Sequence, residues 1–139
     1  NMAIQFSFQT NYPLKSRTKI KQWIKQVIEA KGKKTGNITY IFCDDEYLLE
    51  VNKQYLQHDY YTDVITFDYV ENDLISGDIF ISTDRVRENA LAFGSSETEE
   101  LHRVIIHGAL HLLGLKDKSE KEASQMRQAE NEALKLLNE

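Results

Sequence analysis

Residues 107–117 read HGALHLLGLKD and place two histidines, His107 and His111, inside an otherwise apolar run. A helix turns by about 100° per residue, so side chains four positions apart project from the same face. The other side chains from Val104 to Leu113 are apolar nearly all round, which predicts a helix buried in the core. A buried polar group without a partner costs about 1–3 kcal/mol. Each histidine ring therefore needs a partner.

A divalent metal would be a partner for both rings at once, because helical zinc sites use this i, i+4 spacing. Gly114 can end the helix in a left-handed turn, after which the chain doubles back and delivers Asp117 as a third ligand. Three protein ligands leave a fourth position for water, as in catalytic zinc sites. We predict one Zn²⁺, or another divalent transition metal, per chain, held by His107, His111 and Asp117. The alternative is that each histidine is a core residue hydrogen-bonded within the protein.

The segments before this helix predict alternating strands and helices. Four segments have the alternation and residue types of strands: residues 3–9, 37–45, 63–70 and 76–83. The stretch 71–77 is rich in turn-forming residues and joins the last two strands. Helical apolar spacing predicts three helices: one from Ser16 to Gly32, a short one after Asp44 or Asp45, and one from about Asp84 to Gly94.

Two capping boxes mark the helices that follow. Ser96 with Glu99 begins the histidine helix, and Ser119 with Glu122 begins the last helix. The order is therefore β-α-β-α-β-β and then three helices. It predicts an α+β fold: one domain over residues 1–139, with a mixed four-stranded sheet, about five helices and the metal site on a central buried helix.

Size and composition are those of an ordinary globular protein. With 139 residues, 41% hydrophobic and 28% charged, the chain is large enough for one core and too small for two. No stretch approaches the roughly 20 apolar residues of a membrane span, and the N-terminus lacks a signal-peptide pattern. Cys43 is the one cysteine, which excludes a disulfide framework. We therefore expect a cytoplasmic protein with no membrane partner.

The net charge of −5 is unevenly distributed along the chain. Segment 15–34 holds eight basic residues and one acid, Glu29, so it carries +7 and the rest of the chain −12. Four of its lysines are candidates for binding a nucleic acid: Lys15, Lys19, Lys21 and Lys25. A local positive potential can steer a polyanion to an acidic protein. The alternative is a solvated helix face without a partner.

Four other side chains have structural interpretations. Trp23 lies on the apolar stripe of its helix and is expected in the core. Cys43 ends an apolar strand and is expected to be a small buried side chain, not a nucleophile. His58 and His102 stand among polar residues, so we expect both at the surface.

The histidine segment resembles a motif of the YbeY family of metal-dependent endoribonucleases, His-Gly-x-Leu-His-Leu-x-Gly-x-x-His. This chain matches every specified position except the last, where Asp117 replaces a histidine. The segment 51–67 is similar to the family's Leu-Asn-x-x-Tyr-Arg followed by Thr-Asp-Val-Leu-Ser-Phe, and residues 77–79 match its Gly-Asp-Ile strand. The resemblance covers essentially the whole chain. It implies a single-strand-specific endoribonuclease of ribosomal RNA maturation and ribosome quality control, with RNA precursors and ribosomal proteins as partners.

Two departures from the family pattern affect the expected chemistry. Asp117 replaces a histidine ligand, and a carboxylate oxygen also admits manganese, nickel or cobalt. Leu56 replaces the arginine that the family is thought to use on the phosphate. Another cation, such as a lysine, must then hold the scissile phosphate, or the activity is weaker.

The chemistry expected from these residues is hydrolysis. A bound metal can activate water and polarise a phosphoryl oxygen. Metallopeptidases carry the general base as Glu in His-Glu-x-x-His, but Gly108 occupies that position here. Gly108 instead suggests that another backbone or a substrate passes close to the helix. Asp63 is a candidate to hold a ligand histidine by its other ring nitrogen; alternatively, it only caps a turn.

Three functions remain open at this point. The first is the metal-dependent endoribonuclease. The second is a ribosome-assembly factor that binds RNA or ribosomal proteins and has a mainly structural metal. This possibility stays open because Leu56 replaces the family's arginine. The third is a small metallohydrolase of another substrate, which Gly108 disfavours.

Overall fold

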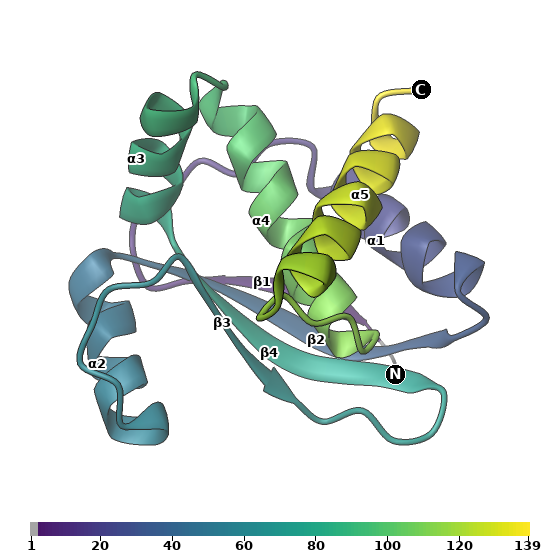
Figure 1. Cartoon of the computed structure of the whole chain (residues 1–139), viewed down its shortest axis with the longest axis horizontal. Helices are drawn as coiled ribbons and strands as arrows, with labels where there is room; N and C mark the ends of the chain where they lie inside the picture. The colour runs from purple at the N-terminus through teal and green to yellow at the C-terminus, as the bar shows by residue number, and fades with distance from the viewer. Residues whose placement is uncertain (1–2) are drawn as a thin grey trace.

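The four strands form one mixed sheet in the order β1-β2-β4-β3. The computed structural model describes residues 3–139. β1 (Ile4–Phe8), β2 (Lys34–Cys43) and β4 (Leu74–Ser82) run parallel, and β3 (Val64–Asp68) pairs antiparallel with β4. Five helices surround the sheet within these residues: α1 (Arg17–Ala30), α2 (Asp45–Leu56), α3 (Thr83–Phe93), α4 (Glu97–Leu112) and α5 (Glu120–Leu137). The predicted element order and the mixed four-stranded sheet are confirmed (Figure 1).

Side-chain caps explain where four of the helices begin. Asp44, Ser82, Ser96 and Ser119 each accept a hydrogen bond from a backbone N–H in the first helical turn. The predicted capping box at Ser119 is complete. At Ser96 only half of the box forms, because the Glu99 carboxylate bonds the Ser96 hydroxyl and not the Ser96 backbone N–H.

The two faces of the sheet are covered differently. The main core lies between one face and the helices α1, α4 and α5, and includes Ile38, Tyr40 and Ile79 from the strands. A smaller cluster on the other face joins Cys43 and Ile65 to two residues of α2. Figure 1 shows α4 and α5 on one side of the sheet and α2 on the other. The helix with the histidines is therefore central and buried, as predicted.

Gly108 sets the distance between α4 and the sheet. A Cβ atom at this position would lie 2.7 Å from Cγ2 of Ile79 on β4, and Ile79 is fully buried. The close neighbour predicted for Gly108 is thus an isoleucine side chain, not a backbone or a substrate. One turn earlier, the Tyr40 hydroxyl donates to the Ile105 carbonyl oxygen at 2.9 Å. These contacts fix α4 against β2 and β4.

Several local predictions need correction. Leu74 and Ile75, predicted only as turn, belong to β4, because they pair with Lys34 and Thr35 of β2. His102, predicted at the surface, is half-buried and packs edge-on against the Trp23 indole, with ring centroids 6.0 Å apart. Trp23 and Cys43 are buried as predicted. Burial raises the pKa of the Cys43 thiol to about 12, so the thiol is not a nucleophile near neutral pH.

Within the part of the chain that the structure describes, no helix is both long enough and apolar enough to cross a membrane.

Candidate metal centre

The C-terminal end of α4 brings the three predicted ligands together. His107 and His111 stand one turn apart with their rings at 82° and centroids 4.6 Å apart. Gly114 has φ 101°, and the N–H groups of Gly114 and Leu115 bond to the last carbonyls of the helix. The chain then reverses and carries Asp117 back to the histidines. One ligand atom of each of His107, His111 and Asp117 lies within 4.8 Å of the others.

The distances between these atoms fit a shared divalent metal. Oδ2 of Asp117 lies 3.3 Å from Nε2 of His107 and 3.4 Å from Nε2 of His111. Ligand atoms about 2.0–2.1 Å from a tetrahedrally coordinated zinc ion would be separated by about 3.4 Å. Unprotonated Nε2 atoms and a carboxylate oxygen are all electron-pair donors, so their convergence favours a cation between them.

Glu130 of α5 orients the first of the two histidines. Its Oε2 lies 2.6 Å from Nδ1 of His107, and its Oε1 accepts from Arg103 at 2.9 Å. A carboxylate can only accept, so the His107 proton sits on Nδ1 and Nε2 is left free to bind a metal. The hydrogen bond that we predicted from Asp63 is therefore made by Glu130. The side chain of Asp63 accepts instead from the Asn89 amide, at 3.4 Å.

The histidines are also less buried than their sequence predicts. Their side chains are 19% exposed for His107 and 26% for His111, because both rings face the surface at the edge of α4. His107 has a protein partner in Glu130, so a metal is not needed to satisfy Nδ1. The interpretation as a hydrogen-bonded core residue therefore holds for Nδ1 of His107, whereas Nε2 lies 3.3 Å from Asp117 and stays available for the predicted metal.

The charges around His107 shift its pKa and that of Glu130 in opposite directions. Burial lowers the pKa of His107, but the hydrogen bond and charge of Glu130 outweigh burial, so the net shift is upward. Burial raises the pKa of Glu130, but hydrogen bonds from His107 and Arg103 bring it below its ordinary value. Each partner thus shifts the pKa of the other in the direction that favours the charged pair when no metal competes for the ring.

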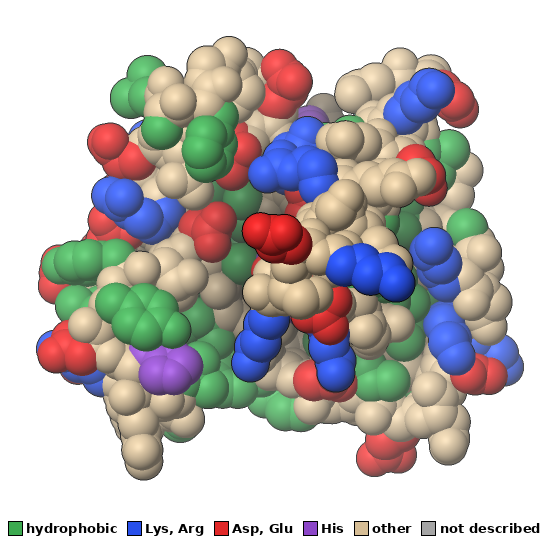
Figure 2. Space-filling view, in the orientation of Figure 1, with side chains coloured by type: hydrophobic (Ala, Val, Ile, Leu, Met, Phe, Trp, Pro, Cys, Tyr) green, Lys and Arg blue, Asp and Glu red, His purple; other side chains and the backbone are tan. Residues whose placement is uncertain are grey.

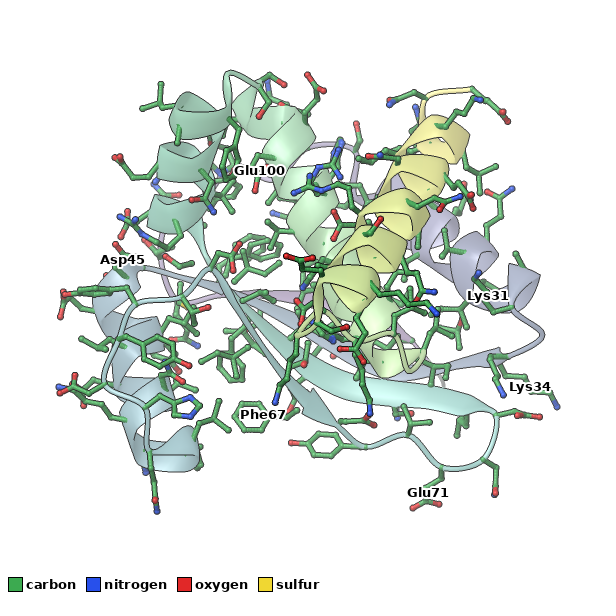
Figure 3. The ribbon with its side chains drawn as sticks, in the orientation of Figure 1. Lys31, Lys34, Asp45, Phe67, Glu71 and Glu100 are labelled. Atoms are coloured by element: carbon green, nitrogen blue, oxygen red, sulfur yellow. The ribbon has the colours of Figure 1, made fainter. Side chains whose placement is uncertain are left out.

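A polar cavity of about 270 Å³ opens beside His107 and Asp117. It is also lined by five other charged side chains: Asp63, Glu100, Arg103, Arg127 and Glu130. Burial raises the pKa of both Asp63 and Glu100, and the charge of Asp63 raises that of Glu100 further. Figure 3 shows Glu100 where α3 and α4 meet, and Figure 2 shows basic and acidic side chains side by side between α3 and α5.

The four lysines proposed to bind RNA lie elsewhere. All four are exposed, and Lys15 precedes α1 instead of belonging to it. Lys21 and Lys25 line a separate cavity with the N-terminal ends of β1 and β2, and Lys21 also lies over the Phe6 ring. Lys31 and Lys34, from the same basic segment, appear across the view from Glu100 in Figure 3. The structure therefore does not bring the basic segment into the metal centre.

The sequence analysis did not identify four charged residues of the cavity. Two of them, Glu100 and Glu130, could have been identified from their positions on buried helix faces. The buried stripe of α5 consists of Met126, Glu130, Ala133 and Leu137, so Glu130 occupies an apolar position. Glu100 lies seven residues before His107 and thus on the same face of α4. A glutamate on a buried stripe must have a partner. Arg103 and Arg127 carry no such signal, because arginines on helix surfaces are common.

The chain is similar to known proteins along nearly its whole length. The chain matches the family model described as "Endoribonuclease YbeY" over residues 5–138. It is 58% identical over 127 residues to the endoribonuclease YbeY of Parabacteroides distasonis, covering 91% of this chain and 89% of that protein. With the endoribonuclease YbeY of Flavobacterium psychrophilum the identity is 50% over 135 residues, covering 97% and 96%. The solution structure of TM1509 from Thermotoga maritima superposes with a TM-score of 0.69 at 25% identity, covering 96% and 88%.

Proposed function

Because the chain belongs to the YbeY endoribonuclease family, we propose that it is a metal-dependent endoribonuclease that hydrolyses phosphodiester bonds in single-stranded RNA. The observation that carries the proposal is the convergence of His107, His111 and Asp117, with the Asp117 carboxylate 3.3 and 3.4 Å from the two imidazoles. Family membership confirms the resemblance read from the sequence. The assembly-factor alternative and the other metallohydrolases are not favoured.

The bound metal is proposed to be zinc. Two imidazole nitrogens, one carboxylate oxygen and one open position are a ligand set of catalytic zinc sites. Such a metal would lower the pKa of water and polarise a phosphoryl oxygen. Glu130 holds the His107 ring in the tautomer that binding requires.

Two carboxyl groups of the cavity are suited to move a proton during hydrolysis. Asp63 and Glu100 line the cavity next to His107, and both have a raised pKa. General acid–base catalysis is most effective when the pKa of the group lies near the working pH. Asp63 is therefore proposed as a proton acceptor and not as the support of a ligand histidine.

The biological substrate is proposed to be precursors of ribosomal RNA, cleaved during maturation and ribosome quality control in the cytoplasm. Ribosomal proteins are proposed as further partners. The support is family membership, together with a single cysteine that is buried and reduced, which requires no oxidising compartment.

The activity is tested by incubating zinc-loaded protein with fluorescently labelled single-stranded RNA and, separately, with casein. We expect cleavage of the RNA and none of casein. His111→Ala should abolish cleavage, whereas His58→Ala, which removes an exposed histidine just after the C-terminal end of α2, should leave it unchanged. RNA cleavage that survives in His111→Ala would show that the three-residue centre is not the active site.

A further inference from the structure

The substrate phosphate needs a positively charged partner that neither Leu56 nor the lysines of α1 supply. Leu56 is an apolar, exposed residue at the C-terminal end of α2 and does not line the cavity beside His107. Lys21 and Lys25 line a different cavity. Among the described residues that line the cavity beside His107, the permanent cations are Arg103 and Arg127.

Arg103 comes from α4 and is held in a fixed orientation. Its two terminal nitrogens donate to Glu130 at 2.9 Å and to Asn131 at 3.0 Å. A guanidinium has five N–H donors, so three remain for another ligand. The side chain is 24% exposed and stands one turn before His107. Arg103 is thus a preorganised donor beside the candidate metal site.

Arg127 comes from α5 and is held much more loosely. Its nearest ionic contact is Glu130, 3.9 Å away, and its side chain is 59% exposed. An ion pair this long and exposed contributes little to stability. The side chain is therefore free to swing onto a ligand that enters the cavity.

Taking the proposed endoribonuclease activity as given, we propose that Arg103 and Arg127 bind the RNA phosphate next to the metal site, in place of the arginine missing at Leu56. Guanidinium groups bind phosphate oxygens through two parallel hydrogen bonds, which a lysine cannot do. We call these two arginines the clamp. Arg103 is its fixed member, and Arg127 closes on the phosphate from α5.

The acidic side chains of the cavity do not oppose this assignment. Glu130 is already paired with His107 and Arg103, so its charge is compensated within the protein. Asp63 and Glu100 are the other acids of the cavity wall apart from the ligand Asp117. Burial raises the pKa of both and so shifts them toward the neutral form, which reduces their repulsion of a phosphate.

Three variants test the clamp. Arg127→Gln removes an exposed charge with little effect on folding. Arg103→Lys keeps the charge opposite Glu130 but loses the planar pair of donors. Lys135→Gln removes a charge from the same helix as Arg127 but outside the cavity, and serves as the matched control. Metal content and melting temperature are recorded for each variant.

Two measurements are made on zinc-loaded protein: steady-state cleavage of labelled single-stranded RNA, and binding of a labelled single-stranded DNA oligonucleotide at several salt concentrations. We expect Arg127→Gln and Arg103→Lys each to lower kcat/KM by about 10- to 100-fold, the effect of losing hydrogen bonds to a charged group. Arg127→Gln should also reduce the slope of log affinity against log salt by about 0.7, as expected when one phosphate is no longer bound. Lys135→Gln should match the unaltered protein in both.

Wild-type kinetics and an unchanged salt slope in Arg127→Gln would overturn the proposal. Loss of activity in Arg103→Lys alone would also overturn it, since Arg103 would then act only by supporting Glu130. If the unaltered protein cleaves no RNA, the endoribonuclease proposal fails. The binding measurement still decides the clamp, because the salt slope of Arg127→Gln does not depend on cleavage.

Discussion

Helix α4 has one dry face and one polar face, and the two are stabilised in different ways. On the dry face, Ile105, Gly108 and Leu112 pack against the sheet, and their fit depends on shape. On the polar face, Glu100, Arg103 and His107 line a cavity. Arg103, His107 and His111 each lie next to a carboxylate, so this face depends on charged partners. One helix can therefore carry both a core and an active site, because its 3.6-residue period separates the two sets of side chains.

The largest expected effect is on the polar face and concerns the metal. Asp117→Ala should weaken zinc binding by on the order of 10³-fold, if roughly 12 kcal/mol of binding energy is shared by the three protein ligands at about 4 kcal/mol each. Asp117→His should still bind zinc, with a preference shifted toward softer metals. Elemental analysis and competition with a chelator measure both. Unchanged zinc affinity in Asp117→Ala would mean that Asp117 is not a ligand.

The next effect is on the dry face. Gly108→Ala adds a methyl group 2.7 Å from Cγ2 of Ile79, so we expect a loss of about 1–3 kcal/mol in the free energy of unfolding, lessened by the higher helix propensity of alanine. Urea denaturation of the metal-free protein measures it. The double variant with Gly108→Ala and Ile79→Ala should lose less stability than the sum of the losses in the two single variants. Strict additivity of the two changes would show that the contact does not set the spacing of α4.

Glu130→Gln tests the hydrogen bond that joins His107 on the polar face of α4 to Glu130 of α5. The amide keeps the size of the side chain but loses the charge that fixes the His107 tautomer. We expect zinc affinity to fall by about 10- to 100-fold. Glu132→Gln, on the exposed side of α5, is the control and should bind zinc normally. Equal zinc affinity in Glu130→Gln and Glu132→Gln would show that Glu130 has only a structural role.

The same pair makes the stability of the metal-free protein depend on pH. The pKa of His107 is raised, so its contribution is complete below the ordinary value of 6.5 and is lost as the pH rises through the raised value. The pKa of Glu130 is lowered, so its contribution is complete above the ordinary value of 4.5 and is lost as the pH falls through the lowered value. We expect the stabilisation to be greatest between pH 4.5 and 6.5. Thermal unfolding with a chelator should show this maximum, and Glu130→Gln should flatten it.

The smallest effect is expected outside α4, on the basic helix. If α1 is an additional docking surface, Lys21→Glu with Lys25→Glu should reduce the salt slope of RNA binding by about 0.7 for each phosphate that the lysines no longer bind. Metal content and folding should not change, because both side chains are exposed. An unaltered slope would show that the lysines are a solvated face and that RNA contacts only the polar side of α4.

Local patterns were sufficient to predict most of the fold. Period-2 and period-3.6 apolar spacing identified the strands and helices, and Asp44, Ser96 and Ser119 mark helix starts through hydrogen bonds that act within one turn. The His107–His111 pair and the returning Asp117 were also visible, since they lie within eleven residues joined by a helix and one glycine turn. Where prediction failed locally, at Leu74 and Ile75, pairing with β2 overrode the turn preference.

What the sequence by itself determined is therefore the order of the elements, the buried histidine helix and the three candidate ligands, because these depend on contacts close along the chain. Only the tertiary structure decided that Glu130, 23 residues after His107, and not Asp63 bonds its ring. It also decided that Arg103 and Arg127 meet at the cavity while Lys21 and Lys25 do not. The reason is that the crossing of α4 and α5 and their packing on the sheet depend on side-chain shapes along both helices, which no local pattern records.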